Sequence, residues 1–180
     1  MNDSKIAVRY AKALFLSAKE KKVLDKVHND VVFVLDICRQ VSELTDLFHS
    51  PIIPASKKKV IVREVFRPDV NKLTLNFLDL IILNKRETFI PDIIRRFISV
   101  YKKHKGITSA TLTTATPVDR EVRNRIIDLI DKAYKTKVDL AGKVEESLIG
   151  GFVLRIEDHL LNASVSSELK KIKRELTGKY

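Results

Sequence analysis

The chain has 180 residues, of which 44% are hydrophobic, so it can bury the core of one or two domains and is not composed like a disordered protein. Its net charge is +11, and its single cysteine, Cys38, excludes an internal disulfide. The densest apolar region has an uninterrupted run only from Leu80 to Leu83, far shorter than the ~20 residues of a membrane span. The N-terminus has no hydrophobic signal core, so we expect a soluble protein.

Apolar residues recur at helical spacing over the first part of the chain, from residue 4 to 105. Cys38 lies on the apolar face of one such stretch, so we expect a buried thiol with no reactive role. Prolines in "SPIIP" and at Pro68 separate the stretches. The predicted helices run through Ile6 to Phe15, Leu24 to Cys38, Leu44 to Phe48, Val60 to Phe66, about Asn71 to Asn84, and Pro91 to Tyr101. This order predicts a six-helix bundle.

The period changes after Gly106, where "ITSATLTTATP", "KVDLAGKVE" and "FVLRIED" have the β-branched or alternating pattern of strands. Between the first two, Thr116 is the expected cap of a helix with Pro117 just inside it. Two helical stripes are predicted, formed by Val122, Ile126, Leu129 and Ala133, and by Val165, Leu169, Ile172 and Leu176. The fold class is therefore α+β, with an N-terminal six-helix bundle (1–105) followed by a small mixed strand-and-helix module (106–180).

The adjacent glycines Gly150 and Gly151 do not have the context of a phosphate-binding loop. Such a loop leads into a helix N-terminus and carries a Lys or further glycines, whereas this pair leads into a predicted strand. We expect the pair to provide a backbone shape that a Cβ would forbid.

No arrangement of residues supports catalysis, a cofactor or a metal. Asp158 and His159 are adjacent, so on a strand they would point to opposite faces. No nucleophile elbow surrounds the serines, and Ser164, Ser166 and Ser167 precede a charged helix that they are suited to cap. The four histidines are scattered without ligand spacing.

The first and fifth predicted helices are apolar over a wider arc than one buried face requires. In "KLTLNFLDLIIL", one set of large side chains lies nearly opposite another. Two interpretations remain open. Each helix is wrapped by its neighbours, or the two helices form a groove that binds an amphipathic helix of a partner.

Three segments resemble the delta subunit of bacterial rotary ATP synthase, whose mitochondrial relative is the oligomycin-sensitivity-conferring protein. They are "RYAKAL", "NKRETFIPDIIRRF" and "ESLIGGFVLRIEDHLLNASVSSELKKIKREL", and the resemblance extends over essentially the whole chain. At Asn162 the family commonly has Asp in an Asp-x-Ser turn, and Asn can make the same local bond.

The resemblance implies a stator subunit and not an enzyme, peripheral on the cytoplasmic face of the bacterial inner membrane. The bundle would bind N-terminal helices of alpha subunits on the catalytic head, and the C-terminal module would bind the end of the b stalk. The residues expected to bind the alpha helix are Ile6, Tyr10, Ala13, Phe77, Leu80 and Asn84. Structural roles are expected for Gly150, Gly151 and the turn from Asp158 through Asn162 to Ser164.

Two other classes of function remain. The +11 charge, most of it in residues 1–105, motivates a basic nucleic-acid-binding adaptor, although the lysine runs lack interleaved aromatic residues for base stacking. The residue types of Ser164 and His159 alone motivate a hydrolase. A nucleic-acid adaptor would lose affinity steeply with added salt.

Overall fold

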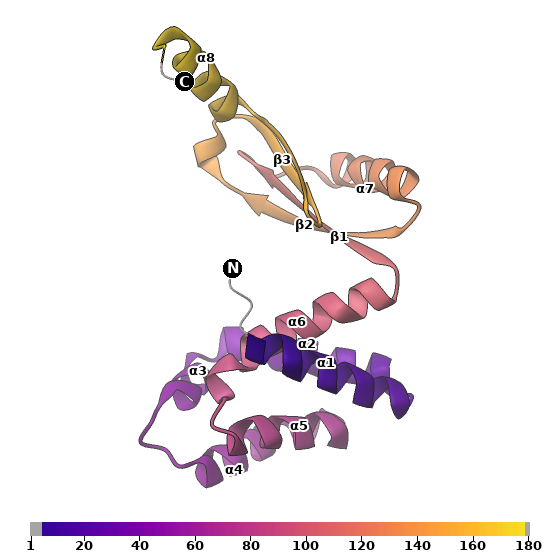
Figure 1. Cartoon of the computed structure of the whole chain (residues 1–180), viewed down its shortest axis with the longest axis vertical. Helices are drawn as coiled ribbons and strands as arrows, with labels where there is room; N and C mark the ends of the chain where they lie inside the picture. Colours follow the sequence, from indigo (N-terminus) through magenta and orange to yellow (C-terminus); the bar gives the residue numbers. More distant parts are fainter. Residues whose placement is uncertain (1–4, 179–180) are drawn as a thin grey trace. The chain divides into compact units, whose positions relative to one another are not determined.

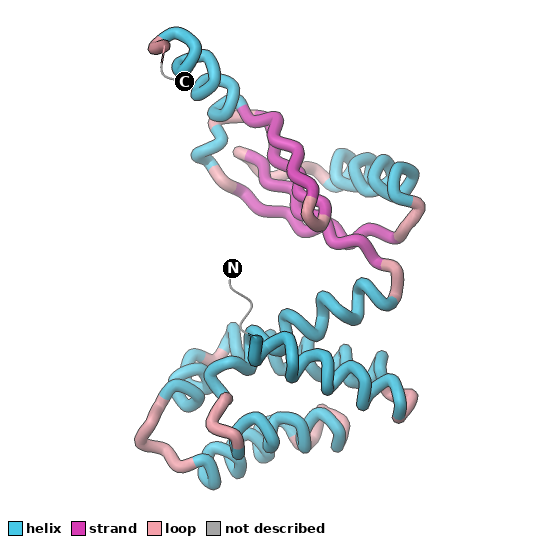
Figure 2. The backbone as a smooth tube through the Cα atoms, in the orientation of Figure 1, coloured by secondary structure: helices cyan, strands magenta, loops and turns pink. Residues whose placement is uncertain are grey.

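The computed structural model describes residues 5–178, and within them it contains eight α-helices and one mixed four-stranded sheet (Figures 1 and 2). The α+β fold class expected from the sequence is confirmed. The chain divides into two compact units, the first ending at Tyr101 and the second beginning at Lys102. None of the described helices combines the length and the apolar character needed to cross a bilayer.

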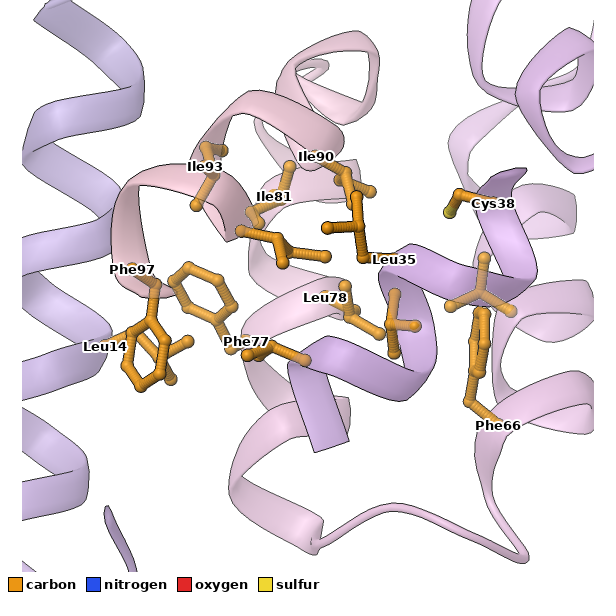
Figure 3. Packing of buried hydrophobic residues seen from close by; sticks show 14 of the residues in the cluster. Leu14, Leu35, Cys38, Phe66, Phe77, Leu78, Ile81, Ile90, Ile93 and Phe97 are labelled. Carbon is orange, nitrogen blue, oxygen red and sulfur yellow. The ribbon is translucent and has the colours of Figure 1, made fainter. Parts of the chain in front are cut away.

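The first unit is helical. Its elements are α1 (Lys5–Glu20), α2 (Leu24–Gln40), α3 (Ser42–His49), α4 (Ala55–Phe66), α5 (Lys72–Leu83), the short 3₁₀-helix η1 (Glu87–Phe89) and most of α6 (Ile90–His104), whose last three residues fall in the second unit. One apolar cluster joins these helices, and Figure 3 shows Phe77, Leu78 and Ile81 of α5 pointing into it. Cys38 is buried in the same cluster, as expected.

A buried carboxylate on α2 holds the start of α5. The Asp30 Oδ2 atom accepts hydrogen bonds from the Thr74 hydroxyl at 2.6 Å and from the Asn71 backbone N–H at 2.8 Å. The Asn71 side chain caps α5 by accepting from the Leu73 N–H. These bonds satisfy backbone donors that a helix N-terminus otherwise leaves free.

A buried ion pair fixes α4 to the segment after α5. The Lys58 Nζ atom lies 2.6 Å from Glu87 Oε1 and donates to the Phe48 carbonyl at 3.2 Å, and the Lys58 side chain is only 4% exposed. The stretch "SKKK" therefore is not a free cationic surface. One lysine is buried, and Lys59 lies 3.6 Å from Asp79 on α5.

The second unit is built on a sheet with strand order β2-β1-β3-β4. Its elements are β1 (Ile107–Thr114), α7 (Arg120–Tyr134), β2 (Lys137–Val144), the 3₁₀-helix η2 (Glu146–Leu148), β3 (Gly151–Ile156), β4 (His159–Ser164) and α8 (Val165–Leu176). Strand β1 pairs with β2 in parallel and with β3 antiparallel. The small core lies between α7 and the sheet, where Ile130 meets Ala110, Leu112 and Leu140.

Helix α7 differs from its prediction in its start and in its inner face. It is preceded by Asp119, not Thr116, and it buries Ile130, with Ile126 and Ile127 packed beside it. Leu129 is 67% exposed, and Val122 and Ala133 are exposed as well. The helix is apolar over so wide an arc that its sequence did not reveal which part faces the sheet.

The segment expected to be a turn from Asp158 to Ser164 is mostly a strand. Only Glu157 and Asp158 form the turn, and residues 159–164 pair with β3 as the edge strand β4. Five of the six residues of β4 are exposed, so the strand has no buried face to set a clear alternation in its sequence.

The first prediction concerns the Lys58–Glu87 pair. Lys58→Met leaves the Glu87 carboxylate buried without its counter-ion, and we expect a loss of about 3–5 kcal/mol in the free energy of unfolding. Lys58→Met/Glu87→Leu removes both charges and should recover most of that loss. Urea unfolding followed by circular dichroism measures both variants. Equal destabilisation of the single and double variants would show that packing, and not the unpaired charge, sets the cost.

Candidate functional site

A groove of about 620 Å³ opens in the first unit between α1, α5 and the segment that follows α5. Aliphatic and aromatic side chains share its lining with arginine, amide and hydroxyl groups. The lining residues are Arg9, Tyr10, Ala13, Leu14, Ser17, Leu73, Asn76, Phe77, Leu80, Asn84 and Arg86.

Both helices divide their apolar residues between the core and this groove. On α5, Leu78, Ile81 and Ile82 are almost completely buried, whereas Leu80 is 50% exposed and lines the groove. On α1, the buried residues are Ala7, Ala11, Leu14, Phe15 and Ala18, and Tyr10 and Ala13 lie at the groove. The wide apolar arcs of the sequence thus correspond to one buried side and one open side.

Five of the six side chains expected to bind a partner helix line the groove together: Tyr10, Ala13, Phe77, Leu80 and Asn84. Ile6 lies one helical turn before Tyr10 and is not part of the lining. The arginines Arg9 and Arg86 were not expected there. Arg9 lies within the quoted "RYAKAL", and Arg86 lies within the quoted "NKRETFIPDIIRRF", but neither belongs to an apolar stripe.

Tyr10 connects the two sides of the groove. Its ring lies 6.3 Å from the Phe77 ring, centroid to centroid, in a tilted arrangement. The Arg86 Nη1 atom donates to the Tyr10 hydroxyl at 3.3 Å, and the Arg86 Cζ atom lies 5.5 Å from the centre of the Tyr10 ring. Asn84 ends α5, and its side-chain amide donates to the Leu80 carbonyl at 2.7 Å. These contacts give the groove a fixed wall.

The groove has the composition of a helix-binding surface: an apolar lining with polar groups placed to orient an occupant. Its described lining contains no paired carboxylates and no nucleophile with an adjacent base. Across residues 5–178, no group of three His, Cys, Asp or Glu side chains gathers as a metal site would require. Burial raises the pKa of Cys38 to about 11, so this thiol is protonated at neutral pH.

The two glycines shape the backbone at the start of β3. Gly151 has φ +73°, and a Cβ there would lie 2.1 Å from the Ala163 carbonyl oxygen on β4. A Cβ on Gly150 would lie 3.2 Å from Cγ2 of Val165. Gly151 thus has a backbone shape that a Cβ would forbid, as expected for the pair, whereas an added Cβ on Gly150 would meet only a side chain.

The polar residues after the glycines cap the last helix. The Asn162 side-chain oxygen accepts from the Ser164 N–H at 3.1 Å, which is the local bond expected of this position, and from the Ser164 hydroxyl at 2.7 Å. The Ser164 oxygen in turn accepts from the Ser167 N–H at the start of α8. Asp158 and His159 are exposed, and His159 and Ser164 stand at opposite ends of β4, too far apart to form the Ser–His pair of a hydrolase.

Comparison with known proteins agrees over nearly the whole chain. The family model described as "ATP synthase delta (OSCP) subunit" matches residues 6–176. The protein named ATP synthase subunit delta from Syntrophomonas wolfei is 35% identical over 177 residues, 98% of this chain and 97% of the relative. The protein of the same name from Parabacteroides distasonis is 34% identical over 176 residues, 98% of each chain.

A solved structure has the same fold. It is a chain in the cryo-EM structure of the Toxoplasma gondii mitochondrial ATP synthase hexamer, which matches with a TM-score of 0.82 at 24% identity over 97% of this chain and 98% of that one. The comparisons give no support to the nucleic-acid adaptor.

The second prediction separates Gly151 from an ordinary strand glycine. Gly151→Ala combines left-handed backbone, which costs about 1–3 kcal/mol for a residue with a Cβ, with a clash against the Ala163 carbonyl. We expect the second unit to lose stability in thermal unfolding. Gly142→Ala on β2 is the matched control, because nothing lies within 4 Å of its added Cβ. Equal melting temperatures of the two variants would contradict this role for Gly151.

Proposed function

The chain belongs to the ATP synthase delta (OSCP) subunit family, and we propose that it links the alpha subunits of the catalytic head to the b subunits of the peripheral stalk. As a member of this family it is a structural subunit of the F-type ATP synthase and a component of its stator. Rotary catalysis exerts torque on the head. A fixed connection to the stalk is therefore needed to stop the head from turning with the rotor.

We assign the alpha subunit to the groove between α1 and α5. The observation that carries this assignment is Leu80, a leucine that lies half exposed in a groove of about 620 Å³ whose other side is formed by Tyr10 and Ala13. An amphipathic N-terminal helix of an alpha subunit would bury these side chains through its own apolar stripe. In this proposal α1 to α6 act as one six-helix bundle, and residues 1–105 are the part that holds the head.

We assign the b stalk to residues 106–180, which lie in the second unit, and within them to α8. This helix has no buried residue, and its whole apolar stripe is exposed. The stripe consists of Val165, Leu169, Ile172 and Leu176. Their spacing of four, three and four is that of a coiled-coil seam, and such a seam is stabilised when a second helix covers it. A helix at the end of the stalk with an apolar stripe of the same spacing would cover it.

The same proposal gives the chain its place in the cell. A subunit held between the head and the stalk of a bacterial ATP synthase would lie on the cytoplasmic face of the inner membrane, attached only through the complex.

The third prediction tests the groove. Leu80→Asp puts a carboxylate without a partner into an apolar contact, so the Kd for a peptide of the alpha subunit N-terminus should rise at least about tenfold, or about 1.4 kcal/mol. Calorimetric titration of the full chain measures it. Because Leu80 is half exposed, the bundle should remain folded by circular dichroism.

Leu83→Asp is the control for this prediction. Leu83 is 60% exposed on the same helix but does not line the groove, so its replacement should leave the Kd unchanged. Equal affinity of both variants and the wild type for the peptide would refute the assignment of the groove.

The fourth prediction tests α8. Leu169→Glu and Ile172→Glu place charge in the exposed stripe and should abolish co-purification with the b subunits. Lys171→Glu changes the net charge more but lies on the far side of the helix, so it should have little effect. If all three variants retain the b subunits, the stalk binds elsewhere.

A further inference from the structure

Arg86 is an arginine held in the groove without a carboxylate. It is half buried, and its hydrogen bond is to the neutral Tyr10 hydroxyl. In the described part of the chain it forms no ion pair. Two other cations of the same unit do form ion pairs. Lys58 pairs with Glu87, and the Arg63 Nε atom donates to Asp79 at 2.9 Å. A half-buried charge without a counter-ion has an energetic cost, which an incoming anion would offset.

The charge of the whole groove has one sign. Among the described residues that line it, Arg9 and Arg86 are cationic and none carries a carboxylate. The remaining polar lining groups are amides and hydroxyls, which are neutral. The groove is therefore complementary to a ligand that is apolar along one side and acidic beside it.

We infer that the segment which occupies the groove is an amphipathic helix bearing a carboxylate at the edge of its apolar stripe, and that Arg86 pairs with that carboxylate. The inference rests on the proposed function of the groove and adds the chemistry that selects the partner. Arg9 contributes a second positive charge. The apolar lining supplies affinity, and Arg86 fixes the position of the helix along the groove.

The geometry suits an arginine at this position. A guanidinium has five N–H donors in a plane, and in this groove one of its nitrogens is engaged by the Tyr10 hydroxyl. The cation lies 5.5 Å from the centre of the Tyr10 ring, close enough for a cation–π contact that orients it. The donors that remain can bind a carboxylate through two parallel bonds. A lysine keeps the charge but not this paired geometry.

The test is a double-mutant cycle by calorimetric titration. The probe is a synthetic peptide of the first ~25 residues of the alpha subunit of the same enzyme, a length that spans several helical turns. It is compared with a series of peptides in which one Asp or Glu at a time is replaced by Asn or Gln. The protein variants are Arg86→Gln, Arg86→Lys and Arg67→Gln. Arg67, at the exposed end of α4, is the control for the loss of one charge.

We expect Arg86→Gln to raise the Kd of the unmodified peptide at least about tenfold, which is near the lower end of the range for close charge pairs at interfaces. Arg86→Lys should lie between that value and the wild type, and Arg67→Gln should have no effect. One of the amide peptides should bind the wild-type protein as weakly as the unmodified peptide binds Arg86→Gln. The same amide peptide should bind Arg86→Gln no more weakly than it binds the wild type.

Three results would overturn the inference. If the wild-type protein does not bind the unmodified peptide, the proposed function of the groove and this inference fall together. If it binds the peptide and Leu80→Asp weakens binding, but every amide peptide binds the wild type as well as the unmodified one, the groove stands and the pairing falls. The peptide series needs no protein variant, so it decides the question even if Arg86→Gln is misfolded. If Arg86→Gln and Arg67→Gln lose equal affinity for the peptide, the effect would come from the net charge of the protein and not from a pair formed by Arg86.

Discussion

The groove exists because α5 is held at both ends. At its start, the Asp30 carboxylate on α2 accepts from the Thr74 hydroxyl and the Asn71 backbone, with Asp30 itself 9% exposed. At its end, the Arg86 backbone N–H donates to the Ile81 carbonyl, and the Arg86 side chain bonds to Tyr10 on α1. Buried hydrogen bonds to a carboxylate are costly to break, because the charge would be left without partners. A helix tied in this way can leave one apolar side open and keep its position.

The sequence predicted the groove as one of two possibilities, and the reason is physical. Wide apolar arcs on α1 and α5 show that both helices have apolar surface beyond one buried face, but they do not tell which side meets the core. Leu80 and Ile81 are adjacent in sequence, yet the first is half exposed and the second fully buried. Arg86 lies in the quoted segment "NKRETFIPDIIRRF", but its contact with Tyr10 could not be predicted, because the two residues are 76 positions apart and meet only through the packing of α1 against α5.

In the second unit, two local signals were read correctly, whereas the cap predicted at Thr116 was wrong. Gly151 and the Asn162–Ser164 cap depend on a positive φ and on bonds between near neighbours, which sequence spacing records. The edge strand β4 and the inner face of α7 depend on which surfaces the sheet covers. Five of six β4 residues are exposed and α7 buries only Ile130, so burial left little pattern there to read. Sequence periodicity reports burial, and it weakens where a small module buries little.

The same sparse burial bears on how a stator subunit can bind two partners. Each unit has its own apolar cluster, one among the helices and one between α7 and the sheet. Leu80 in the first unit and Leu169 in the second are about half exposed and belong to neither cluster. Phe77, which also lines the groove, belongs to the helical cluster, and Tyr10 packs against it. The proposed contacts therefore combine side chains that the fold does not need with a wall that the core holds in place. Apolar surface that a fold does not need is a liability for a free protein, because it promotes association. Its retention on both units is understandable if each surface is covered in the assembled enzyme, where burial at both contacts resists the torque on the head.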